Sequence, residues 1–145
     1  MKIAIITSRF NESVTSALKK GALEWLAENK ISDEQITCID VPGAVEIPFV
    51  AKQLAKKNHY DAIICLGAVI RGETTHYDYV CEQVSFGCQQ VMMQFDIPVI
   101  FGVLTTENEA QAFDRVGGAH GHKGRDAANA ALEMVAIARS LKNTV

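Results

Sequence analysis

The chain has 145 residues, 48% of them hydrophobic and 21% charged, and a formal net charge of −3. This length predicts a single domain over residues 1–145, and the acidic balance argues against a basic face for nucleic acid or anionic membranes. No apolar stretch reaches the length of a membrane span, and no secretory leader precedes the first apolar run. We therefore expect a cytoplasmic protein with four reduced cysteines, because no C-x-x-C pair occurs.

Four short apolar runs alternate with helical patterns. The runs cover residues 2–7, 36–41, 61–67 and 98–104, and they are continuous, as is typical of strands buried on both faces. Helical patterns follow at residues 11–26, 46–58, 77–95, 108–116 and 125–142, with Asn11 as a plausible N-cap of the first. This order predicts an α/β fold, namely a flavodoxin-like three-layer α/β/α sandwich with a four-stranded parallel sheet.

Two of the expected helices are apolar on more than one side. The helix at 77–95 spreads valine, cysteine, methionine and phenylalanine around its axis, and the last helix is rich in alanine nearly all round. A helix that is apolar on most sides should be covered on most sides, which favours a homo-oligomer. The alternative is a merely hydrophobic small domain.

The candidate site lies where the expected strands end. Ligands of open α/β sheets bind at the carboxyl ends of the strands, and residues 8–11, 42–46, 67–76 and 102–108 are rich in glycine, hydroxyls, amides or charge. Phe10 could stack on a planar heterocycle or serve as a hydrophobic staple of the first helix. Glu46 could hold ligand hydroxyls or simply be a favourable anion at a helix start.

The segment from Leu66 to Tyr79 carries the densest chemistry. Gly72 allows a tight turn, after which Glu73 and Thr74 could present N–H and hydroxyl groups to an oxyanion at a helix start. No nucleoside-triphosphate or dinucleotide motif is present, so a small phosphoester fits better. His76 follows as a group that can move protons near neutral pH. Arg71 is expected to pair with Glu73, Asp78 or a neighbouring subunit.

A last glycine-rich loop runs from Gly117 to Gly124. Arg115 before it and Lys123 within it are cations that could meet a phosphate. The spacing of His120 and His122 invites a metal site, but no acidic or thiol partner has metal-ligand spacing nearby, so we expect no metal.

Six motifs in order resemble the lumazine synthase family: "SRFN", "VPGAVEIP", "GAVIRGETTHYDY", "IPVIFGVLTTEN", "DRVGGAHGHKG" and "ALEM", over about Ile3 to Leu141. The resemblance implies that 5-amino-6-ribitylaminouracil condenses with 3,4-dihydroxy-2-butanone 4-phosphate, giving 6,7-dimethyl-8-ribityllumazine, phosphate and water in riboflavin biosynthesis. It implies two small-molecule substrates and no metal or organic cofactor. It also implies a homopentamer at least, with an icosahedral shell as a larger assembly open to it, sites at subunit interfaces and no nucleic-acid or membrane partner.

The resemblance also implies roles for individual residues. His76 matches the proton-transferring histidine. The residues implied to hold the pyrimidine and ribityl groups are Phe10, Asn11, Ala44, Val45, Glu46, Ala68, Val69, Ile70 and Phe101. Those implied to hold the phosphate are Glu73, Thr74, Arg115 and Lys123, and Phe101 and Arg115 match residues that an adjacent subunit supplies.

Three positions depart from the family pattern. Val45 stands where an aromatic side chain is common, and Ala119 and His122 stand where a lysine and an asparagine are common. The chain also begins at the first core strand, whereas many relatives carry an extra strand before it that pairs with a neighbour. This difference argues against a larger shell more than against a pentamer. Two further readings remain: a flavodoxin-like module that binds a ribityl ligand, a flavin or a phosphate without turnover, and a shell protein with a decayed site.

Overall fold

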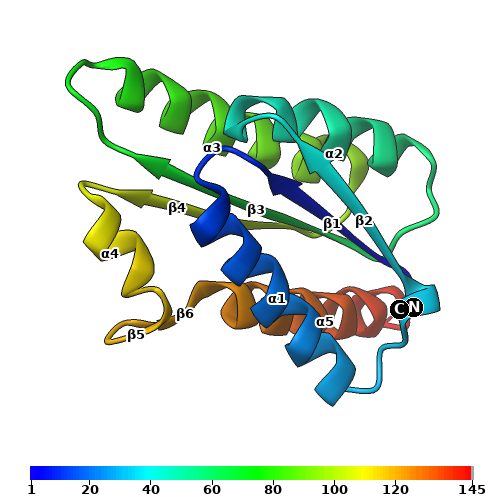
Figure 1. The fold of residues 1–145 in the computed structure, drawn as a ribbon. Helices are drawn as coiled ribbons and strands as arrows, with labels where there is room; N and C mark the ends of the chain where they lie inside the picture. Colours follow the sequence, from blue (N-terminus) through cyan, green and yellow to red (C-terminus); the bar gives the residue numbers. More distant parts are fainter. Residues whose placement is uncertain (145) are drawn as a thin grey trace.

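The computed structural model describes residues 1–144 and contains a four-stranded parallel sheet in the order β2-β1-β3-β4 (Figure 1). The strands are β1 (Ile3–Ser8), β2 (Ile36–Val41), β3 (Ala62–Ile70) and β4 (Val99–Thr106). The long helices are α1 (Glu12–Glu28), α2 (Ile47–Lys56), α3 (His76–Phe95) and α5 (Lys123–Lys142). The shorter pieces are η1 (Asp33–Gln35), η2 (Ala44–Glu46), α4 (Glu109–Phe113), β5 (Val116–Gly118) and β6 (Gly121–His122).

Helices cover both faces of the sheet, which confirms the predicted three-layer sandwich. In β1, Ala4 and Ile6 join the hydrophobic cluster beneath α2 and α3, while Ile3 and Ile5 join the cluster beneath α1 and α5. Successive side chains of a strand point to opposite faces, so a strand covered on both sides is apolar at every position. This is why β1 and β3 read as continuous apolar runs, whereas the edge strand β2, expected to be buried on both faces, is mostly half-buried or exposed. Figure 1 shows α2 and α3 on one side of the sheet and α1 and α5 on the other.

The strands end at different heights, and this stagger makes room for a site. The pairing of β1 with β3 stops at Thr7 and Leu66, whereas β3 and β4 stay paired through Ile70 and Thr106. The last residues of β3 therefore extend beyond the end of β1 with a strand on only one side. The start of the chain and the end of α5 lie together at the opposite, amino-terminal edge of the sheet (Figure 1).

Three local details differ from the sequence expectations. The glycine-rich segment forms a short antiparallel hairpin of β5 and β6 rather than an open loop, and α5 begins at Lys123, two residues early. Asn11 does occupy the N-cap position of α1, but its backbone is left-handed (φ 63°) and its side chain makes no capping hydrogen bond. In the described part of the chain, no helix is long and apolar enough to cross a membrane.

Candidate active site

A cleft of about 470 Å³ opens at the carboxyl edge of the sheet, between β1, β3 and the start of α3. Its size falls within the range of small-molecule sites, and most of its lining is apolar. The lining residues are Phe10, Asn11, Gly43, Ala44, Val45, Ala68, Val69, Ile70, Gly72, Thr74, His76, Tyr77 and Val80. The fold thus gathers nine of the residues that sequence analysis assigned to the site.

One wall of the cleft is set by the corner between β1 and α1. Asn11 Nδ2 donates a 2.9 Å hydrogen bond to the carbonyl oxygen of Ala68, which fastens this corner to the protruding end of β3. Phe10 precedes it with its side chain 72% exposed. A hydrophobic staple would be packed against its helix, so this exposure favours a ring available to a planar ligand.

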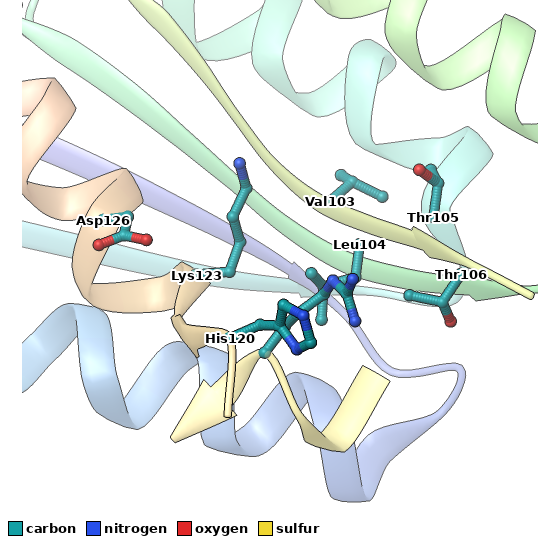
Figure 2. A pocket seen from close by; sticks show the side chains of 8 residues that line it. Val103, Leu104, Thr105, Thr106, His120, Lys123 and Asp126 are labelled. Atoms are coloured by element: carbon teal, nitrogen blue, oxygen red, sulfur yellow. The ribbon is translucent and has the colours of Figure 1, made fainter. Parts of the chain in front are cut away.

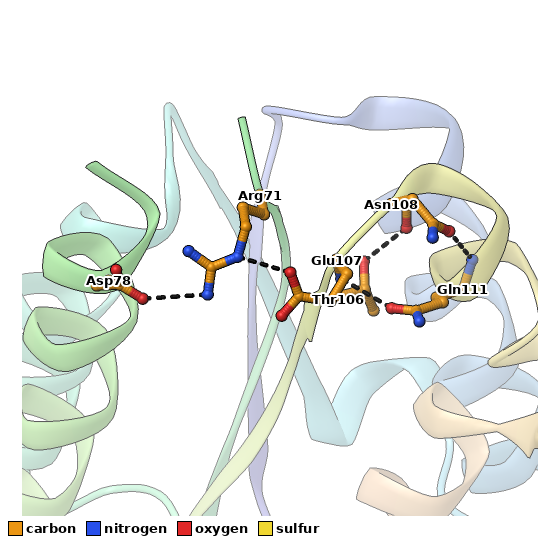
Figure 3. A network of polar contacts seen from close by, with 6 residues as sticks. All are labelled: Arg71, Asp78, Thr106, Glu107, Asn108 and Gln111. Carbon is orange, nitrogen blue, oxygen red and sulfur yellow. Dashed lines mark hydrogen bonds and ion pairs between the residues drawn. The ribbon is translucent and has the colours of Figure 1, made fainter. Parts of the chain in front are cut away.

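Arg71 holds the far side of the cleft together rather than lining it. Its Nε donates to Glu107 at 2.6 Å and its Nη2 contacts Asp78 at 3.3 Å, so the guanidinium bridges β3, the end of β4 and the first turn of α3 (Figure 3). These hydrogen bonds raise the pKa of Arg71. The expected pairing with Asp78 is therefore present, and Glu107 is a partner that the sequence did not indicate.

The same guanidinium lies 4.3 Å from the ring centroid of Tyr77, a cleft residue, in a cation–π contact. Burial raises the pKa of Tyr77, and its phenol can donate a hydrogen bond. Arg71 thus acts on the cleft indirectly, by holding a lining side chain.

Thr74 and His76 stand at the mouth of the cleft. His76 is the first residue of α3, and its backbone N–H donates to Thr74 Oγ1 at 3.2 Å. The side chains of both residues line the cleft, whereas Glu73 is exposed outside the lining. An imidazole and a hydroxyl at the start of a 20-residue helix suit proton transfer beside an anion.

The turn after β2 forms the opposite lip. Ala44 and Val45 line the cleft, and Val45 is 36% exposed. Glu46 lies just outside the lining, but its Oε1 is so close to Gly43 that a Cβ there would lie 3.1 Å away. The carboxylate therefore covers the small residue at the rim, within reach of a ligand that extends past it.

A second cavity, of about 270 Å³, lies between the end of β4, the β5–β6 hairpin and the start of α5. Figure 2 shows Lys123 at the start of α5 and His120 in the hairpin beside the β4 residues. The lining residues are Val103, Leu104, Thr105, Thr106, Arg115, His120, Lys123 and Asp126.

One chain therefore does not bring all the expected site residues together. Arg115 and Lys123 line the second cavity, apart from Thr74 and His76 in the cleft. Phe101 lies in neither: it is half-buried and packs against the hydrophobic cluster beneath α2 and α3.

The two histidines of the glycine-rich segment have different surroundings. His120 is exposed and lines the second cavity. His122 instead caps α5, because its Nδ1 accepts a hydrogen bond from the backbone N–H of Arg125 at 3.3 Å. Its ring also packs on Gly21 of α1, where an added Cβ would lie 2.1 Å from Cε1. Within residues 1–144, no three His, Cys, Asp or Glu side chains are grouped as a metal site.

Sequence reasoning missed several lining residues. Tyr77 and Val80 belong to the first turns of α3, and His120 and Asp126 belong to the second cavity. A helical spacing of four from His76 could have indicated Val80, and a spacing of three then links Val80 back to Tyr77. No local signal places His120 and Asp126 beside the end of β4.

The fold is an open α/β sandwich with a cleft at the carboxyl edge of its parallel sheet, the place where proteins of this class bind small ligands. The family model described as 6,7-dimethyl-8-ribityllumazine synthase matches residues 1–139. A 6,7-dimethyl-8-ribityllumazine synthase of Coxiella burnetii (strain Dugway 5J108-111) is 55% identical over 143 residues, covering 99% of this chain and 95% of that protein. The protein of the same name from strain CbuG_Q212 is 54% identical over the same shares. The chain belongs to the 6,7-dimethyl-8-ribityllumazine synthase family.

Proposed function

We propose that this chain carries out the reaction of its family in the cleft at the carboxyl edge of the sheet. Membership of the family makes it a transferase of riboflavin biosynthesis that forms 6,7-dimethyl-8-ribityllumazine. The observation that carries the proposal is the common lining: an exposed ring, Phe10, and a proton-transfer group, His76, border one volume of about 470 Å³. We place the reaction in the cytoplasm, which suits the four free cysteines.

The roles follow from the chemistry of the condensation. The pyrimidine stacks on Phe10 beside Val45, and backbone groups of Ala68 to Ile70 meet its polar edge, while Glu46 holds ribityl hydroxyls and Asn11 keeps the wall in place. The amine then attacks the ketone, water leaves to give an imine, phosphate is eliminated and the ring closes. Each of these steps moves a proton, which His76 relays. Holding both substrates in one orientation lowers the barrier further.

The phosphate is stabilised by the backbone N–H groups of Glu73 and Thr74 and the Thr74 hydroxyl, just before α3, and by Arg115 and Lys123. Because Arg115 and Lys123 line a separate cavity in each chain, we propose that a neighbouring subunit supplies them, together with Phe101. The assembly is then a homopentamer at least, with each site at a subunit interface. The exposed side chains of Tyr79, Phe86 and Met93, at intervals of seven along α3, support a covered helix face.

Complementation between variants tests the shared site. Arg115→Ala and His76→Ala each remove one partner, so each pure variant should turn over slowly. When the two are unfolded and refolded together, mixed interfaces should recover up to about a quarter of the wild-type activity, because some sites then hold both intact residues. Recovery in the mixture supports sites between subunits, and equal mass by light scattering excludes a difference in assembly. No recovery in particles of normal size contradicts a shared site.

A direct assay separates the enzyme from a binding module. Both substrates are mixed with the protein, and lumazine is followed by absorbance and fluorescence. The alternative, a module that binds a ribityl ligand or a flavin without turnover, is favoured by one feature, Val45, which leaves one side of the cleft without an aromatic ring. Tight ligand binding without lumazine formation would favour the module. If assembled particles show no ligand binding and no turnover, that result would favour a shell protein with a decayed site.

A further inference from the structure

The second cavity gathers three basic side chains from three separate pieces of the chain. Arg115 follows α4, His120 lies in the turn between β5 and β6, and Lys123 begins α5. Among the ion pairs of residues 1–144, none includes Arg115 or Lys123. Arg115 Nη1 instead donates to the neutral carbonyl oxygen of Gln111 at 2.8 Å. Two cations therefore line one cavity, and neither has a carboxylate ion-pair partner among residues 1–144.

The remaining charges leave this cavity electropositive. Asp126 is the carboxylate of its lining, so Arg115 and Lys123 against Asp126 give a net charge of +1 before His120 is counted. Lys123 is also the first residue of a 20-residue helix, whose N-terminus adds partial positive charge. An anion is the ligand that these groups favour.

The hairpin holds His120 at the mouth of this cavity. Its backbone N–H donates to the carbonyl oxygen of Asp114 at 2.9 Å, and Gly118 pairs with Gly121 on either side of the turn. Gly121 has a φ of +74°, which few other residues adopt without strain. The backbone is thus fastened while the imidazole stays exposed.

We propose that His120 is a third ligand of the substrate phosphate beside Arg115 and Lys123, and that it binds the phosphate in its protonated form. The assignment of the anion as a substrate phosphate rests on the proposed function. An imidazolium can donate from both ring nitrogens and carries the charge that a phosphate dianion favours. Histidine gains or loses this charge between about pH 5 and 8, unlike Arg115 or Lys123.

The groups around His120 decide the direction of the pH effect. Arg115, Lys123 and Asp126 line the same cavity as His120, and the Asp114 carbonyl oxygen accepts the backbone N–H of His120. A bound phosphate places two negative charges beside the imidazole, and these favour its protonated form. Binding therefore takes up a proton, and His120 strengthens it most at the acidic end of the range.

Four proteins test the proposal: wild type, His120→Gln, His120→Lys, and His59→Gln as a control at an exposed histidine on the opposite edge of the sheet. The KM for the phosphorylated substrate and the Kd for inorganic phosphate are measured between about pH 5.5 and 8. Variants are compared at the same pH, so that the change in charge of the phosphate itself affects all of them equally. His120→Gln should raise both constants about threefold to tenfold at pH 5.5 and much less at pH 8. His120→Lys should bind phosphate tightly at both ends of the pH range, and the two constants of His59→Gln should equal those of wild type at each pH.

The outcomes separate this proposal from the proposed function. Parallel pH profiles for wild type and His120→Gln overturn the role of His120 while leaving the enzyme intact. An equal loss at every pH also overturns it, because loss of hairpin shape rather than of charge would be responsible. A wild type that forms no lumazine but binds inorganic phosphate through His120 overturns the proposed function and supports the site.

Discussion

The side-chain amide of Asn11 donates a hydrogen bond to the carbonyl oxygen of Ala68, 57 positions along the chain. This bond joins the start of α1 to the part of β3 that extends beyond β1. The left-handed backbone of Asn11 (φ 63°) turns the side chain away from its own helix and toward β3. Asparagine suits both needs, since it tolerates this conformation and carries the amide donor.

Substitution of Asn11 should separate the contribution of the hydrogen bond from that of the left-handed backbone. Asn11→Ala loses the hydrogen bond and strains the backbone, and should lower the free energy of unfolding by about 1.5–3 kcal/mol. Asn11→Gly keeps the backbone relaxed and should cost about 0.5–1.5 kcal/mol. Urea unfolding at one protein concentration measures both. Equal losses in the two variants would show that the left-handed conformation carries no cost.

His76→Ala should slow turnover about tenfold or more while leaving substrate affinity nearly unchanged, because a proton relay acts on the reacting bonds rather than on binding. Steady-state kinetics with each substrate varied in turn measures kcat and KM separately. His59→Ala is the matched control. If KM rises as much as kcat falls, His76 serves binding and not proton transfer.

Val45→Phe should tighten the cleft on the pyrimidine substrate. The exposed Phe10 already offers one ring, and a second ring across the lining would add stacking worth about 0.5–1.5 kcal/mol, or roughly threefold to tenfold in affinity. Isothermal titration with the pyrimidine substrate alone measures the change. Val45→Leu is the control for added bulk without a ring; an equal gain in that variant would rule out stacking as the cause.

Gly21→Ala should weaken the contact between α1 and α5. The new Cβ would lie 2.1 Å from His122 Cε1, so the ring must move and its cap on the N–H of Arg125 should be lost. We expect a loss of about 1–3 kcal/mol in the free energy of unfolding. Gly72→Ala is the control, because an added Cβ there meets nothing within 4 Å. Similar losses in both variants would point to backbone effects instead.

Alkaline pH should destabilise the protein through Cys65. A hydrogen bond with Cys88 and complete burial raise the pKa of Cys65 well above its usual 9.0. The unfolded chain then loses this proton first, so the stabilisation is full below pH 9 and disappears as the pH rises through the folded pKa. The free energy of unfolding should fall by up to about 1.4 kcal/mol per pH unit from this group.

Cys65→Ala is the variant for the alkaline experiment. It should be less stable at pH 7, because it leaves a small cavity, but its stability should fall less steeply above pH 9. A shallower slope remains, since Cys38, Cys81 and Tyr77 also have raised pKa values. An unchanged slope in Cys65→Ala would exclude this thiol as the main alkaline group.

The sequence by itself determined the layers of the fold and the edge that carries the site. Strands apolar at every position can only be buried on both faces, so the continuous runs at β1, β3 and β4 were enough to predict a parallel sheet covered by helices. The polar and aromatic residues at the strand ends, such as Phe10–Asn11 and Thr74–His76, indicated the carboxyl edge, because parallel strands end together there. Both properties depend on residue types at neighbouring positions, so they can be read directly from the sequence.

Only the tertiary structure decided which side chains share a cavity. The side-chain partner of Asn11 lies 57 residues away, Arg71 pairs with Glu107 across 36 residues, and His120 lies beside the end of β4. Such pairings depend on strand register, on the depth at which a helix packs and on single backbone angles, none of which has a sequence period. For the same reason one chain separates Arg115 and Lys123 from His76, although the motifs that carry them follow one another in a single sequence.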